Sequence, residues 1–199
     1  MRLSKKGEYA LRSLINLGIA AEVGRSLVRV SELADNEQLP VKFLEQIMHA
    51  LKEGDLIESE RGKFGGYRLA RPANKITVGS IVRLIDGPLA PIGCVSQTAY
   101  EKCTCPDEEH CGLRMLMLDV RNAIAGILDR YTLADVVEVT LRKLRRNGVP
   151  LPFSPEAEIA APPVRVPARH ARRLARGARS PRFDATEGVL HQLLGDYSI

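Results

Sequence analysis

A glycine-rich basic turn at residues 61–66 is the feature that most limits how this chain can fold. It holds three glycines together with Arg61 and Lys63. So many glycines favour a tight turn, and the short segments on either side, residues 56–59 and 67–69, are suited to pair across it. The sequence therefore predicts a two-stranded hairpin with a positively charged tip.

Three helical patterns precede this hairpin. The first begins after Ser4, which can serve as its N-cap, and runs to about Val23. The second has Ser31 as its expected N-cap, and the third starts with Pro40 in its first position and ends at Gly54. Two short helices joined by a tight turn and followed by a hairpin make a winged helix-turn-helix.

Residues 1–72 are therefore predicted to form a DNA-binding domain. An α-helix fits the major groove, and a thin basic hairpin can approach phosphates or the minor groove. The residues expected to contact DNA lie on the outer side of the third helix and at the hairpin tip: Lys42, Glu45, Gln46, Arg61 and Lys63. The alternative is that these charges form an ordinary solvated face of an α+β domain.

A long amphipathic helix dominates the second predicted unit, residues 73–149. The pattern predicts this helix at Gly112–Arg130, with a shorter one before it at Val78–Asp86 and another after it, capped by Thr132. The apolar stripe of the long helix comprises Leu113, Leu116, Met117, Val120, Ile124, Ile127 and Leu128. The stripe is too long for one small domain to cover, so we expect a dimerisation helix, with ordinary core as the alternative. The predicted fold class is mainly α with a small β-hairpin.

All four cysteines of the chain lie within 18 residues of a loop: Cys94, Cys103, Cys105 and Cys111. Clustered thiolates suit soft metals, either zinc or iron in an iron–sulfur cluster. The spacing lacks the paired knuckles of a zinc finger, which favours iron–sulfur over zinc and leaves a metal-free thiol switch as a third alternative. In a reducing compartment, a structural disulfide is not expected.

Composition changes after residue 149. Seven of the twelve prolines lie in residues 150–181, and residues 165–182 contain seven arginines and no acidic residue. Proline cannot propagate a helix or a central strand, so residues 150–199 are predicted to be a disordered Pro/Arg-rich arm, with a short apolar segment near the end. A scaffold that acts through this basic arm is an alternative function.

Several classes of protein are excluded by the same sequence. No apolar run is long enough to span a membrane, and Glu8, Arg12 and Asn16 interrupt the only stretch that resembles a secretory signal, so a cytoplasmic protein is expected. No nucleophile–base motif, phosphate loop or dinucleotide fingerprint is present. We therefore expect neither an enzyme nor a small-molecule substrate. The net charge of +5 weakly favours an anionic partner.

Residues 1–147 resemble the Rrf2 family of bacterial winged-helix transcription regulators. The resemblance rests on residues 1–4, 8–12, 43–47, 62–69 and 132–137, together with the cysteine loop. It implies a homodimer that binds double-stranded operator DNA, favours a repressor, and implies sensing of iron, redox or nitric-oxide status through an iron–sulfur cluster.

The resemblance also implies a ligand set for that cluster. Three loop cysteines are usual, and these places fall to Cys94, Cys105 and Cys111. Arg114 stands where some members of the family place a histidine ligand, and arginine cannot ligate iron. The fourth ligand is then Cys103, or Glu8 supplied by the partner subunit. A 2Fe–2S and a 4Fe–4S cluster both remain open.

Overall fold

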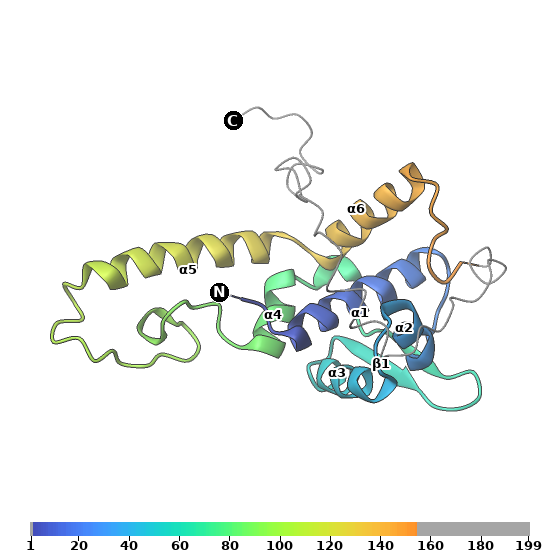
Figure 1. The fold of residues 1–199 in the computed structure, drawn as a ribbon, viewed down its shortest axis with the longest axis horizontal. Helices are drawn as coiled ribbons and strands as arrows, with labels where there is room; N and C mark the ends of the chain where they lie inside the picture. The colour runs from blue at the N-terminus through green and yellow to red at the C-terminus, as the bar shows by residue number, and fades with distance from the viewer. Residues whose placement is uncertain (1, 155–199) are drawn as a thin grey trace, which may run out of the picture.

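The computed structural model describes residues 2–154, and this part of the chain is mainly helical with one small hairpin, as the sequence predicts (Figure 1). In chain order, the elements are α1 (Lys5–Glu22), α2 (Val30–Glu37), α3 (Val41–Glu53), β1 (Ile57–Glu60), β2 (Gly66–Leu69), α4 (Val78–Asp86), α5 (Gly112–Arg130) and α6 (Leu133–Arg146). Two single 3-10 turns, η1 (Ala73–Lys75) and η2 (Gly93–Val95), lie in the connections. No helix in the described range is long and apolar enough to cross a membrane.

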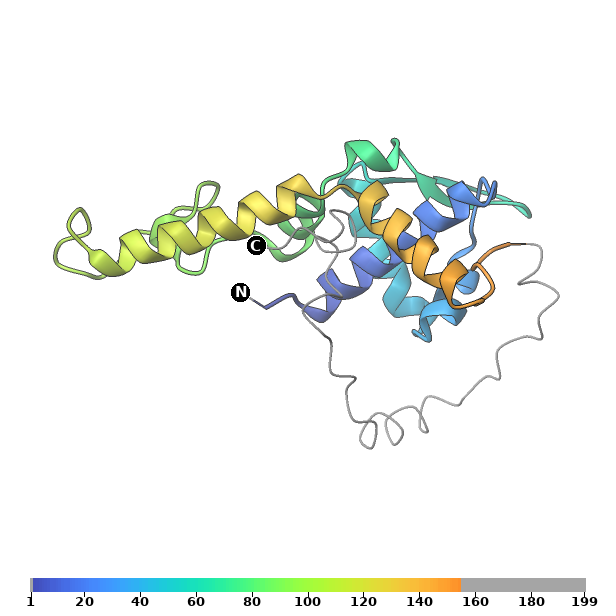
Figure 2. The ribbon, with the colours of Figure 1, turned by 90° about the horizontal axis from the view of Figure 1, so that it is seen from above.

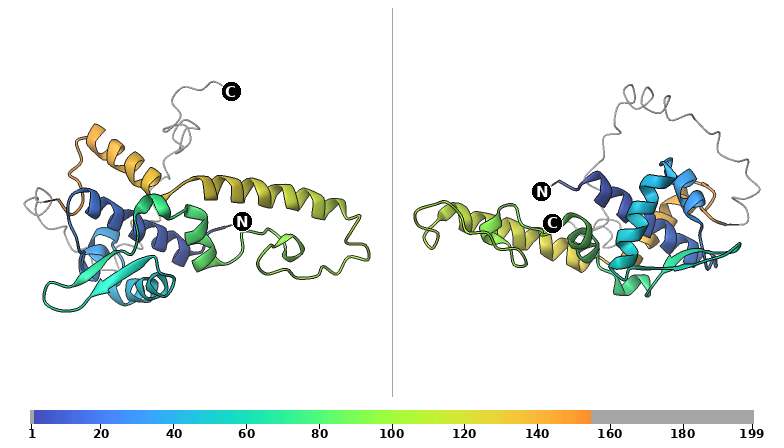
Figure 3. Two further views of the ribbon diagram at one scale, coloured as in Figure 1. Left: turned by 180° about the vertical axis from the view of Figure 1, so that it is seen from behind. Right: turned by 90° about the horizontal axis from the view of Figure 1, so that it is seen from below.

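An aliphatic core joins α1 to α2, α3, α4 and α6. Its largest fully buried side chains are Leu14, Ile19, Leu33, Leu44, Ile47, Met48, Leu51, Leu56, Ile57, Ile76, Ile81 and Leu133. Gly18 lets α6 approach α1 closely, because a Cβ atom there would come within 2.6 Å of a Val137 methyl group. α3 and the hairpin lie together on the side of this body away from α6 (Figures 1 and 3).

Helix boundaries follow the expected capping residues except at α2. Ser4, Thr77 and Thr132 each accept a backbone hydrogen bond from the first turn of α1, α4 and α6. The prediction of Ser31 as N-cap of α2 is wrong: the helix begins at Val30 with Arg29 as its cap. The Glu32 carboxylate accepts a hydrogen bond from the Arg29 backbone N–H, so the N-cap lies two residues earlier than expected.

Two further local details differ from expectation. Pro40 is the N-cap of α3 and not its first helical residue. Gly54 follows α3, but the left-handed backbone conformation falls on Asp55, with a φ of 53°. Neither shift changes which face of α3 is buried.

α5 projects from the helical body, with residues 87–111 running beside it (Figures 1 and 2). Its apolar stripe is divided between two environments. Leu113, Leu116, Val120 and Ile127 are exposed, whereas Met117, Ile124 and Leu128 are half-buried. The exposed set recurs at steps of three, four and seven residues, so it forms one continuous face of the helix.

The folded structure extends past the predicted start of the arm. Leu151 and Phe153 pack against the core, and Ser154 is buried and donates a hydrogen bond to the Leu151 carbonyl (2.8 Å). Residues 150–154 therefore belong with the helical body. The rest of the predicted arm, residues 155–199, lies outside the described residues.

Candidate nucleic-acid interface and cysteine loop

α3 presents a polar outer face opposite its buried one. Lys42, Glu45 and Gln46 are exposed, and the apolar residues between and beyond them point into the core. Spacings of three and four residues place the three polar side chains on adjacent turns of one face. They can therefore reach a surface that meets α3 from outside.

The hairpin is a short wing with a basic tip. β1 and β2 pair antiparallel, from Ile57 opposite Leu69 to Glu60 opposite Gly66. Arg61 and Lys63 are exposed at the turn. Gly65 is required there, because a Cβ atom would lie 2.2 Å from the Glu60 carbonyl oxygen.

Two contacts fasten the wing to the rest of the domain. Val28 and Tyr67 exchange backbone hydrogen bonds of 3.0 and 2.8 Å. They form an isolated antiparallel β-bridge between the segment before α2 and strand β2. The Arg29 guanidinium donates to the Lys63 carbonyl oxygen at 2.7 Å. The wing tip is thus held at the N-terminus of α2.

A concave basic surface lies between α3 and the wing. A cavity of about 530 Å³ is lined by Arg29, His49, Lys52 and Arg61, among others. Sequence reasoning did not single out Arg29 or Lys52 as site residues. Lys52 follows Glu45 by seven residues, so helical spacing was a usable signal for it. Arg29 had no such signal, because its place depends on the fold of the wing.

Arg68 on β2 does not add to the positive charge of this concave surface. Its guanidinium pairs with the carboxylates of Glu60 and Glu58 across the strand. The hydrogen bonds that Arg68 donates to these two carboxylates, to Glu60 first, raise the pKa of Arg68 above its ordinary value. Arg61 and Lys63, at the wing tip, have no such ion pair with the carboxylates of β1 among the described residues.

The cysteine loop holds its four sulfurs in three different settings. Cys94 is buried in η2, and Cys111 is half-buried at the N-terminus of α5. Cys103 and Cys105 are joined by a disulfide, which differs from the expectation of free thiols throughout.

Arg114 has a structural role in this loop. Its Nε donates to the Cys94 carbonyl oxygen (3.4 Å) and lies 3.3 Å from a Glu108 carboxylate oxygen. The arginine therefore ties the start of the loop to α5 at the position where some relatives were expected to have a histidine.

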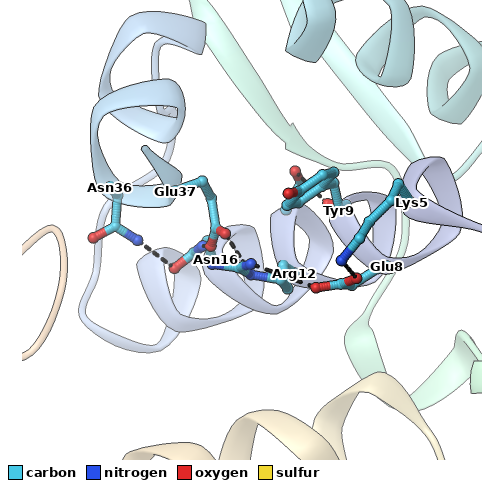
Figure 4. Close-up of polar contacts among 8 residues, drawn as sticks. Lys5, Glu8, Tyr9, Arg12, Asn16, Asn36 and Glu37 are labelled. Atoms are coloured by element: carbon cyan, nitrogen blue, oxygen red, sulfur yellow. Dashed lines mark hydrogen bonds and ion pairs between the residues drawn. The ribbon is translucent and has the colours of Figure 1, made fainter. Parts of the chain in front are cut away.

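Glu8 lies in a network of charges along α1 (Figure 4). Its carboxylate lies 2.6 Å from the Lys5 ammonium and 3.8 Å from the Arg12 guanidinium. Arg12 continues to Glu37 of α2 at 2.5 Å, and Glu37 accepts a hydrogen bond from the buried Asn16. Hydrogen bonding to Glu8 raises the pKa of Lys5. The network joins α1 to the end of α2.

Comparison with known proteins gives this architecture a family. The sequence model of Rrf2, described as an iron-dependent transcriptional regulator, matches residues 3–139. The chain belongs to the Rrf2 family.

Relatives and solved structures agree with this assignment. An rrf2-like HTH-type transcriptional regulator of Rhodobacter capsulatus is 34% identical over 139 residues, covering 68% of this chain and 91% of the relative. The structure of CymR, the global cysteine regulator of B. subtilis, superposes with a TM-score of 0.59 at 30% identity, over 69% of this chain and 97% of CymR. The structure of T. potens IscR gives 0.54 at 26% identity, over 69% and 87%.

Rrf2 membership confirms three expectations from the sequence. The chain is a transcriptional regulator with a helix-turn-helix, its fold is the winged fold of the CymR structure, and its family is not one of enzymes. Operator DNA is therefore the expected partner of this regulator. Dimerisation and the chemistry of the cysteine loop do not follow from family membership.

The donor set of the Rrf2 loop fits an iron–sulfur cluster in chemistry but not in arrangement. Four thiol sulfurs are the ligand type that iron–sulfur clusters use. Among the described residues, however, no three side chains of His, Cys, Asp or Glu gather as a metal site, and two of the four sulfurs are bonded to each other. In this conformation the four sulfurs do not come together as one cluster site.

Proposed function

We propose that this Rrf2 protein is a homodimeric transcription repressor that binds operator DNA through α3 and the wing. The observation that carries the proposal is the basic concave surface between the two elements, lined by Arg29, Lys52 and Arg61. Lys42, Glu45 and Gln46 extend this surface along α3. Because its proposed target is chromosomal DNA, we also propose that it works in the cytoplasm.

Each DNA-contacting element has a distinct proposed task. Lys42 and Gln46 contact base edges in the major groove, and Glu45 accepts from a cytosine amino group. Arg61 and Lys63 contact phosphates or the minor groove. Lys52 donates to the Ser59 hydroxyl at 2.7 Å, which brings its ammonium toward the wing and suits it to a phosphate between the two elements.

The proposed dimer uses the exposed face of α5. Leu113, Leu116 and Ile127 are each more than half exposed on a helix that projects from its own domain. A monomer with this face in water would leave a contiguous apolar patch unburied, which is unfavourable and marks an interaction surface. A two-fold dimer built on α5 would place two winged domains on a pseudo-palindromic operator.

The cysteine loop is the proposed sensor. The resemblance assigns an iron–sulfur cluster to Cys94, Cys105 and Cys111 with Cys103 or Glu8, and such a cluster requires a loop arrangement other than the one described. A second candidate is a thiol switch, which the Cys103–Cys105 disulfide specifically favours. The two chemistries compete for Cys105.

One experiment separates these sensors. The full chain is purified without oxygen, and its visible absorbance, iron and acid-labile sulfide are measured together with operator affinity. A cluster gives a coloured protein with iron and sulfide. A thiol switch gives a colourless protein with four free thiols when reduced and two after mild oxidation forms the disulfide, and the operator affinity changes between these states. If neither loss of the cluster nor oxidation of the thiols changes operator affinity, the loop is not the sensor.

A further inference from the structure

Arg121 is a buried cation on the inner side of α5. It is the one residue of this helix that is buried, with 9% of its surface exposed. No hydrogen bond or ion pair joins it to another residue of the described range, and its Nε is fully buried without a partner. Arginine stays protonated in proteins, so the charge cannot be removed by loss of a proton.

A buried guanidinium N–H without a hydrogen-bond acceptor is unfavourable. The neighbouring cation, Arg83, does not change this, because both of its terminal nitrogens are bonded to Asp129. No acidic residue lines the cavity that Arg121 shares with Arg83. The Arg121 guanidinium therefore has no carboxylate partner here, and an anion could accept a hydrogen bond from its buried Nε–H.

The cavity next to Arg121 is small and partly polar. Its volume is about 20 Å³, and its lining includes Ser96, Gln97 and Thr98 as well as the two arginines. The Ser96 hydroxyl accepts a hydrogen bond from the Ala99 N–H at 3.0 Å, so its own proton is available to a ligand. A cavity of this size has room for roughly one to two water-sized groups.

We propose that this cavity binds one small monovalent anion on Arg121 and Ser96. The size excludes phosphate, sulfate and nucleotides, and the lining supplies donors and positive charge for a chloride ion or the smallest carboxylate, formate. A water molecule would fill the same space but would not neutralise the guanidinium.

The anion would also connect the sensor loop to α5. Ser96 to Thr98 follow Cys94 by two to four residues, and Arg121 lies two turns along α5 from Arg114, which holds the Cys94 carbonyl. Bound anion would therefore hold the start of the cysteine loop against α5. This site does not depend on the proposed DNA-binding surface.

Thermal unfolding of the full chain in different salts tests the site. The salts are sodium chloride, sodium formate and sodium gluconate at equal ionic strength, with gluconate as an anion too large for the cavity. We expect a saturable rise in Tm on the order of 2–4 °C in chloride or formate over gluconate, because a ligand that binds only the folded state stabilises it. Whichever of chloride and formate saturates at lower concentration is the better ligand.

Variants on the same helix supply the control. Arg121→Gln should unfold at the same temperature in all three salts, whereas Arg130→Gln, which removes an exposed charge from α5, should keep the wild-type response. Chloride-35 NMR of the wild type gives an independent readout that needs no variant: line broadening that formate displaces and gluconate does not. Equal Tm values of the wild type in all salts, or no displaceable broadening, would overturn the proposal.

Discussion

Arg83 of α4 and Asp129 of α5 form a two-bond ion pair, with distances of 2.6 and 2.7 Å between the guanidinium nitrogens and the two carboxylate oxygens. The pair lies near the C-terminal end of α5, where this projecting helix meets the body of the domain. Gly79 leaves room for it, because a Cβ atom there would lie 2.0 Å from an Asp129 oxygen. The pair therefore helps to set the direction in which α5 leaves the winged domain.

This pair makes a pH-dependent contribution to stability. The hydrogen bond from Arg83 holds the pKa of Asp129 below its ordinary value of 3.8. A carboxyl group with a lowered pKa in the folded state contributes stability that is present above the ordinary value and is lost as pH falls through the folded-state value. Both side chains are about one third or more exposed, so the contribution is limited by solvent.

We expect Asp129→Asn to lower the free energy of unfolding by about 0.5–1 kcal/mol at pH 7. The difference from the wild type should shrink as pH falls through the lowered pKa of Asp129, because the wild-type carboxyl group then becomes protonated as well. Urea unfolding at pH 7 and at an acidic pH below that pKa measures it. A difference that is equal at both would show that the pair's charge does not stabilise the fold.

The proposed dimer interface has a direct test on α5. Leu116→Glu places a charge on the exposed apolar face, and we expect the dimer to dissociate at least about tenfold more readily, equivalent to about 1.4 kcal/mol. Sedimentation measures the change. Asn122→Glu is the matched control, since it adds the same charge to another exposed face of the helix. Ile124 is less suitable because it is half-buried within its own chain. A Leu116→Glu protein that dimerises like Asn122→Glu would exclude this interface.

Two truncations test where the folded unit ends. A chain ending at Gly148 lacks Leu151 and Phe153, which pack on the core, and we expect it to lose about 1–3 kcal/mol of stability. A chain ending at Ser154 keeps these contacts and should retain both the fold and the operator preference. Equal unfolding free energies for the two truncated chains would mean that residues 149–154 add nothing to the core.

Much of the fold was predictable because local patterns carry it. The bounds of α5, Gly112–Arg130, match the apolar period, and Thr77 and Thr132 cap the helices expected of them. Ser31 failed as a cap because the helix already begins at Val30, where the Glu32 carboxylate accepts a hydrogen bond from the Arg29 backbone N–H. A residue type names a candidate cap, but the side chains around it decide which one is used.

The residues of the proposed DNA-binding surface were predictable only where helical periodicity indicates which side chains face outward. The outward positions of Lys42 and Gln46 follow from the buried face of α3. Arg29 was missed because its role depends on contact with the wing, 34 residues away. The unpaired state of Arg121 depends on which groups the folded loop brings near it, and no spacing in the sequence indicates that.

Salt dependence should separate the two kinds of proposed DNA contact. Arg61→Ala removes a cation from the wing, so we expect weaker binding to all duplexes and a slope of affinity against salt that is smaller by about one released ion. Gln46→Ala removes a neutral group and should leave that slope unchanged. Fluorescence anisotropy over a range of salt concentrations measures both slopes, and identical slopes for Arg61→Ala and wild type would remove Arg61 from the interface.

The central claim is that the exposed face of α3 reads operator sequence, and selection of duplex DNA from a random pool tests it most directly. The full-length wild type should enrich one sequence with two-fold symmetry. On that sequence, Gln46→Ala should lose about 1–3 kcal/mol of binding free energy, with much less loss on random DNA, since base contacts carry discrimination. If the wild type enriches no sequence, or if Gln46→Ala binds the enriched sequence as tightly as the wild type, α3 does not read the operator as proposed.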